Sequence, residues 1–161
     1  MKYILFVLIC INLVGCASSD SKEPIPPMPE DFNFKLKYGV NSIQEIDTFN
    51  DRVLKDLVEY GTVEASISLQ KEEMESIYKQ MMALDIMEIE LQDDSSGNGE
   101  LDAISKWHIE MNGTTNSFYY NTLSETSQLE IELFELEKTI HKMIEEKPEY
   151  KELPEASGGY E

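Results

Sequence analysis

Apolar and polar residues alternate one by one over several stretches of the chain, and this pattern predicts strands. The alternation runs through residues 32–40, 63–69, 87–91 and 106–111, and through the shorter run 118–120. A period of two with one apolar face predicts a sheet with one side in water, and such sheets are usually antiparallel. Asn112-Gly113 predicts a hairpin turn between the last two runs because both residues tolerate positive φ. Residues 42–58 fit either a strand pair around Asn50-Asp51 or a short helix.

Two other stretches have the helical period. The first apolar stripe consists of Met74, Ile77, Tyr78, Met81 and Leu84. The second, in residues 123–146, consists of Leu129, Leu133, Leu136, Ile140, Met143 and Ile144. Thr122 and Glu125 have the spacing of a capping box at its start, and Pro148 ends it. We therefore expect an α+β domain, a twisted antiparallel sheet with two helices packed on its apolar face.

The N-terminus has the pattern of an export signal. Lys2 precedes an apolar run that is too short to span a bilayer and has the length found in secretory signals. The run ends in Leu13-Val14-Gly15-Cys16, which resembles the bacterial lipobox. That resemblance implies that residues 1–15 are removed and that the thiol of Cys16 carries lipid on the outer face of the cell membrane. An ordinary cleaved signal with a chance cysteine is the alternative.

The remaining chain divides into a tether, one domain and a tail. Residues 16–30 hold four of the six prolines, which favours an extended spacer after the lipidated cysteine. Residues 31–150 form the α+β domain, and residues 151–161 are expected to be a flexible tail. Cys10 leaves with the signal and Cys16 carries lipid, so no cysteine remains for a disulfide. Packing of the core must then supply the stability.

The charge of the chain limits its partners. The 13 Lys and Arg residues face 32 Asp and Glu residues, which gives a net charge of -19. Nucleic acid, a polyanion, is excluded as a partner by this charge. An acidic surface suits a basic protein or a cationic component of the cell envelope.

Several short segments carry a family resemblance. They are the Phe-x-Phe opening of the first strand with Tyr38-Gly39-Val40, residues 71–78 after a Val/Ile strand, residues 150–154, and the terminal Gly-Gly-Tyr. With the lipobox and tether, they make the chain similar to a loose group of small lipoproteins of unknown function from Bacillus-like, single-membrane bacteria. The resemblance covers most of the mature chain and implies location and class. It implies no activity and no functional residues.

The loop after residue 93 has part of a calcium-binding pattern. Asp94, Ser96, Asn98 and Asp102 would supply oxygen ligands around Gly99, but Ser105 stands where the bidentate glutamate belongs. The alternative is a polar loop whose Asn-Gly and Ser-Gly pairs form turns. Calcium is the one cofactor that the sequence suggests.

The sequence contains no recognisable catalytic arrangement. His108 and His141 fall on different elements and outside known ligand motifs, and we expect His108 to be solvated. No G-x-S-x-G motif and no phosphate-binding glycine loop is present. Trp107 lies on an apolar strand face and is expected in the core. We therefore expect a non-catalytic, lipid-anchored binding or envelope-structural protein; the alternative is an inhibitor or immunity-type protein that blocks a basic extracellular enzyme or toxin.

Overall fold

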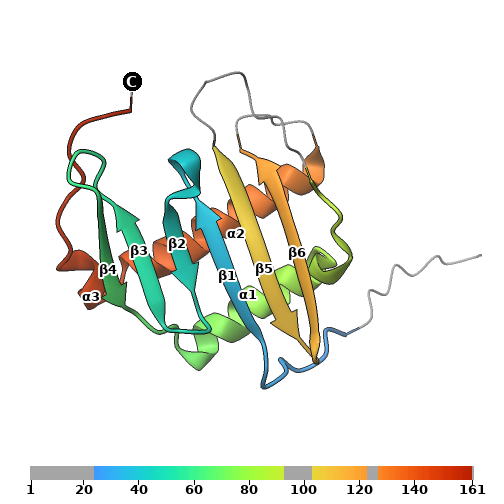
Figure 1. Cartoon of the computed structure of the whole chain (residues 1–161). Helices are drawn as coiled ribbons and strands as arrows, with labels where there is room; N and C mark the ends of the chain where they lie inside the picture. The colour runs from blue at the N-terminus through green and yellow to red at the C-terminus, as the bar shows by residue number, and fades with distance from the viewer. Residues whose placement is uncertain (1–23, 93–102, 123–126, 161) are drawn as a thin grey trace, which may run out of the picture.

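The fold has two layers, a sheet and a set of helices. The structure is a computed structural model that describes residues 24–92, 103–122 and 127–160. A six-stranded, fully antiparallel open sheet has the order β4-β3-β2-β1-β5-β6. The two long helices lie behind this sheet in Figure 1 and leave its front face open. The expected α+β architecture is therefore confirmed.

The strands follow the alternation of the sequence. The first four form a meander of β1 (Asn33–Tyr38), β2 (Gln44–Asp47), β3 (Arg52–Asp56) and β4 (Thr62–Ser66). The hairpin of β5 (Ile104–Met111) and β6 (Thr114–Asn121) then pairs with the other edge of β1. Asn112 and Gly113 both have positive φ in its turn, as predicted. The 3-10 turn η1 (Val40–Ser42) ends where residues 42–58 begin. These residues contain the strand pair β2–β3, so the strand alternative is the right one.

Two long helices cover the inner face of the sheet. α1 (Lys71–Ala83) follows the meander, and α2 (Gln128–Glu145) follows the hairpin. The cap of α2 is a reciprocal pair in which Ser127 Oγ accepts from the Glu130 N–H and Glu130 accepts from the Ser127 N–H at 2.8 Å. The predicted cap at Thr122 is wrong, because the Thr122 hydroxyl donates to the Ala103 carbonyl beside the sheet. Pro148 ends α2 as predicted and opens the short helix α3 (Pro148–Lys151).

The core lies between the inner sheet face and these helices. Phe34 and Leu36 of β1 and Ile109 of β5 have no exposed surface. From the helix layer, Ile77 of α1 and Leu133 of α2 are equally buried. Trp107 is 2% exposed and stacks on Phe118, so its predicted place in the core is confirmed.

The strand predicted at residues 87–91 is wrong. Asp85 adopts a left-handed conformation, and the chain then forms the 3-10 turn η2 (Ile86–Glu88). Ile86 and Ile89, three residues apart, are the buried positions, so the period of two did not describe this segment. The chain beyond η2 still reaches the sheet, because the Tyr119 N–H donates to the Leu91 carbonyl at the β6 edge.

The C-terminal segment contacts the meander. Residues 151–160, which we expected to form a flexible tail, include the end of α3 and a strand-like bridge from Ser157 to Val58. The Ser157 carbonyl accepts from the Glu59 N–H, and the Ser157 N–H donates to the Leu57 carbonyl. In Figure 1 this segment runs beside β4 at one end of the sheet.

Candidate functional site

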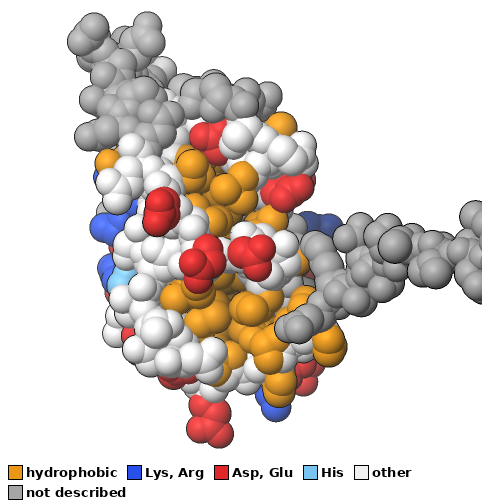
Figure 2. All heavy atoms as spheres, turned by 90° about the vertical axis from the view of Figure 1, so that its right-hand side faces the viewer, with side chains coloured by type: hydrophobic (Ala, Val, Ile, Leu, Met, Phe, Trp, Pro, Cys, Tyr) orange, Lys and Arg blue, Asp and Glu red, His pale blue; other side chains and the backbone are white. Residues whose placement is uncertain are grey.

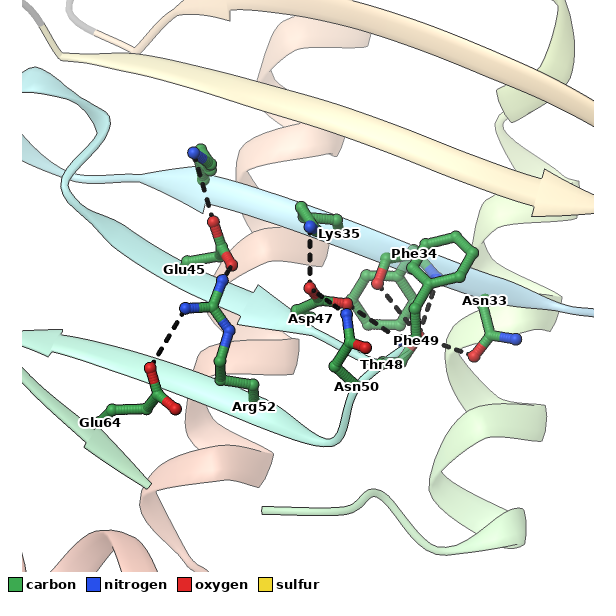
Figure 3. A network of polar contacts seen from close by, with 11 residues as sticks. Asn33, Phe34, Lys35, Glu45, Asp47, Thr48, Phe49, Asn50, Arg52 and Glu64 are labelled. Atoms are coloured by element: carbon green, nitrogen blue, oxygen red, sulfur yellow. Dashed lines mark hydrogen bonds and ion pairs between the residues drawn. The ribbon is translucent and has the colours of Figure 1, made fainter. Parts of the chain in front are cut away.

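The open face of the sheet carries an ion-pair network in its meander. Lys35 Nζ lies 2.8 Å from Asp47, and Arg52 bridges Glu45 and Glu64 (Figure 3). Glu45 and Asp47 are almost completely buried although no helix covers this face. Burial would raise the pKa of Asp47, but hydrogen bonds from Lys35, Asn50 and the Phe49 N–H hold that pKa below its ordinary value. The network therefore fixes the positions of two carboxyl groups in β2.

Basic side chains gather on the same face beside this network. Lys37 of β1 stands directly opposite Lys106 of β5, and Lys35 stands directly opposite His108. These four residues, with Trp107 between them, line a shallow hollow of about 140 Å³. His108 is exposed, as expected, and its Nδ1 lies 2.8 Å from Ser117 Oγ. In Figure 2 the basic and histidine side chains appear along the left rim, where the open face is seen edge-on.

A second polar group lies inside the molecule, between the sheet and α2. Ser105 Oγ donates to Glu137 at 2.6 Å, and the Tyr120 hydroxyl makes a longer contact of 3.4 Å with the same oxygen. Burial raises the pKa of Glu137 to about 7, while these two hydrogen bonds act in the opposite direction. Burial, and then the charge of Glu137, raise the pKa of Tyr120. Trp107 Nε1 is buried nearby and has no hydrogen-bond partner among the described residues.

His141 lies one turn further along α2 in an aromatic environment. Its ring packs edge-on against Tyr38 and Tyr150, with centroids 5.3 and 6.2 Å away. Burial lowers the pKa of His141, Glu145 opposes this shift, and Lys55 adds to it. His141 Nε2 is 3.8 Å from Glu145, too far for a hydrogen bond. The ring thus packs between two tyrosines.

Ser105 and Glu137 are both enclosed by the protein. A serine beside a carboxylate resembles an activated nucleophile, but Ser105 has no exposed surface. Neither Ser105 nor Glu137 is among the residues that line four surface hollows in the described part of the chain.

The helix layer presents an apolar surface with an acidic rim. Ile131 and Phe134 of α2 are 44% and 39% exposed, large fractions for side chains of their size. Ile131 lies between two hollows, one of about 360 Å³ between α1 and α2 and one of about 170 Å³ toward the end of β6. Glu135 lines both hollows, and Glu132 lines the larger. Figure 2 shows hydrophobic side chains in two groups separated by acidic ones on this side of the molecule.

The residues singled out from the sequence have different outcomes. Cys16 and the proposed calcium ligands Asp94, Ser96, Asn98 and Asp102 lie outside the described residues, so lipidation and calcium binding stay predictions. Ser105, the twelfth position of the calcium pattern, points into the core toward Glu137. Within residues 24–92, 103–122 and 127–160, no group of three or more His, Cys, Asp or Glu side chains is placed to hold a metal ion.

The sequence did not identify the two surfaces described above. Alternation placed Lys35 and Lys37 on the wet face of one strand and Lys106 and His108 on that of another. It gave no indication that these strands are neighbours, which depends on the insertion of β5 beside β1. Ile131 and Phe134 are apolar but fall between the residues of the predicted stripe of α2, so the sequence could have indicated that they are exposed.

Comparison with known proteins gives no family for this chain. No protein-family model matches it, and no curated protein matches it significantly. In the part of the chain that the structure describes, no helix has the length and apolar character needed to cross a membrane. Function must therefore be argued from the surfaces themselves.

Proposed function

We propose that the protein is a non-catalytic binding module, anchored by lipid on Cys16 at the outer face of the cell membrane, and that its partner is a basic protein. The lipobox and the proline-rich tether support the location. The family resemblance to small lipoproteins of single-membrane bacteria agrees with it. The tether would hold the folded domain away from the membrane while the lipid retains it.

The apolar surface of α2 is the observation that carries the proposed partner. Ile131 and Phe134 are exposed side by side, one helical turn apart, next to a hollow between two helices. Two parallel or antiparallel helices with an apolar groove between them can accept a third amphipathic helix. Glu132 and Glu135 beside the groove, in a chain of net charge -19, select a basic segment as its occupant.

The first experiment tests the anchor. Cells that express the protein are labelled with a clickable palmitate analogue, and the wild type is compared with Cys16→Ala. We expect label and membrane association in the wild type, and neither in the variant. A wild-type protein that is exported without label would show an ordinary cleaved signal, and the lipid anchor would be rejected.

The second experiment tests the partner and its surface. A photo-crosslinking residue replaces Phe134, and in a matched control it replaces Tyr60, which is 73% exposed on the turn between β3 and β4. We expect position 134 to capture one basic protein in living cells and position 60 not to capture it. Charge reversal at Glu132 and Glu135 should abolish the capture. Equal capture from both positions, or an acidic captured protein, would contradict the proposal.

The alternative, an inhibitor or immunity-type protein, predicts a different property of the captured partner. The partner would be an extracellular enzyme or toxin whose activity falls on addition of the protein. The Phe134→Asp variant would then lose inhibition together with binding. A partner whose activity does not change supports the binding or envelope-structural module instead.

A further inference from the structure

Two rows of side chains cross the open face of the sheet over four strands. The strand registers place Glu45, Lys37, Lys106 and Tyr119 in one row across β2, β1, β5 and β6. The neighbouring row consists of Asp47, Lys35, His108 and Ser117. In each row an acid stands on β2, bases stand on β1 and β5, and a hydroxyl stands on β6. The two rows enclose the hollow described above.

This arrangement opposes the stability of the sheet. Like charges directly opposite each other on neighbouring strands are destabilising, and Lys37 is directly opposite Lys106. An acid at position 106 would instead form a cross-strand ion pair with Lys37. Local departures from the stabilising pattern are expected at functional sites.

The acids on β2 orient Lys35 and Lys37 and leave some of their N–H donors free. Asp47 holds Lys35 at 2.8 Å and Glu45 holds Lys37 at 3.3 Å, both from the side away from β5. A lysine ammonium has three donors, so each keeps donors for a ligand. Lys106 forms no ion pair with any described residue.

We infer that the hollow between β1 and β5 is a binding site for a phosphate-type oxyanion, held by Lys35, Lys37, Lys106 and His108. A tetrahedral oxyanion offers oxygens to donors on several sides, whereas a planar carboxylate offers two. Lys37 of β1 and Lys106 of β5 are direct neighbours that both line the hollow, with a serine hydroxyl beside His108. Lysines bind phosphate as point charges and need no bidentate geometry. This site lies on the face opposite α2, so it is independent of the proposed protein partner.

The test follows the backbone amide signals of the full mature chain, kept in solution by Cys16→Ala, during titration with sodium phosphate. Sodium chloride and sodium acetate at the same ionic strength are the comparison salts. We expect saturable shifts at Lys37, Lys106 and His108 in phosphate and none that saturate in the other salts. Phosphate shifts that do not saturate, or equal shifts in all three salts, would overturn the inference.

Two charge reversals separate a site from a general charge effect. Lys106→Glu places an acid opposite Lys37, whereas Lys71→Glu makes the same change of charge at the exposed start of α1. We expect Lys106→Glu to lose phosphate binding at least tenfold and to raise the melting temperature without phosphate, because a like-charge pair becomes an opposite pair. Lys71→Glu should keep the phosphate affinity. Equal loss in both variants would overturn the inference.

The source of the phosphate is distinguished by a second titration. Vesicles of phosphatidylglycerol are compared with vesicles of phosphatidylcholine and with free phosphate. If free phosphate saturates the site and vesicles bind no more tightly than free phosphate, the ligand is a free anion. Binding to phosphatidylglycerol at least tenfold tighter, and sensitive to Lys106→Glu, identifies a lipid headgroup. No binding to either would overturn the inference.

Discussion

The buried carboxyl group of Glu137 makes the stability of this protein depend on pH in a specific way. Its side chain is 6% exposed and accepts hydrogen bonds from Ser105 and Tyr120 between the sheet and α2. Substitution by glutamine keeps the shape of the side chain and an oxygen that accepts the same hydrogen bonds. It also removes the ionisation, so the variant resembles the wild type with Glu137 permanently protonated.

The magnitude follows from the pKa of Glu137 in the two states. Folding raises it from 4.5 to about 7, so between these values the folded state binds more protons than the unfolded state. Stability that is fully present below pH 4.5 is therefore lost as the pH rises through 7. Each unit corresponds to 1.36 kcal/mol, so a shift of this size makes a difference of about 3 kcal/mol. The Glu137→Gln variant lacks this loss.

The assay is urea unfolding of both proteins at a series of pH values from 4 to 8. Other groups titrate in this range, so the informative quantity is the difference in free energy of unfolding between wild type and variant. We expect the free energy of unfolding of Glu137→Gln, relative to that of the wild type, to rise by about 3 kcal/mol from the lowest to the highest pH. Glu132→Gln makes the same substitution on the exposed face of α2 and is the control. Parallel curves for wild type and Glu137→Gln would refute the reasoning.

Two further predictions concern the helix layer. Ser127→Ala removes the side-chain acceptor at the start of α2 and should lower the free energy of unfolding by about 1 kcal/mol in urea unfolding, whereas Ser127→Asp, which restores an acceptor, should recover most of it. Ile77→Ala leaves a cavity where α1 meets the sheet and should cost about 2–5 kcal/mol by the same measurement, and a loss well under 1 kcal/mol would show that α1 is not packed as described.

The fold was predictable because its elements are locally encoded. Alternating apolar and polar residues predicted β1, β4, β5 and β6, and the apolar stripe from Met74 to Leu84 predicted α1. The failure at residues 87–91 has a physical cause, since alternation over so few residues also fits a turn that buries Ile86 and Ile89. The start of α2 was misplaced because Thr122 and Ser127 both precede a glutamate by three residues. Only tertiary contacts decide between two such caps.

The candidate sites were less predictable because they depend on pairings between distant residues. Lys37 and Lys106 are directly opposite in the sheet, although 69 positions separate them in the sequence. Sequence patterns specify which face of a strand a residue occupies, but not which strand lies beside it. The Ser105–Glu137 hydrogen bond has the same origin, since it joins a strand to a helix that starts beyond the next strand.

The net charge of -19 predicts an unusual salt dependence for the inferred phosphate site. Acids elsewhere on the molecule repel phosphate over long distances, while Lys35, Lys37 and Lys106 attract it at short distance. The screening length falls from about 30 Å at ~0.01 M salt to about 10 Å at ~0.1 M, so added salt first removes the long-range repulsion. Phosphate affinity should therefore rise, pass through a maximum and then fall as sodium chloride is added. A steady fall from the lowest salt onward would refute this balance of attraction and repulsion.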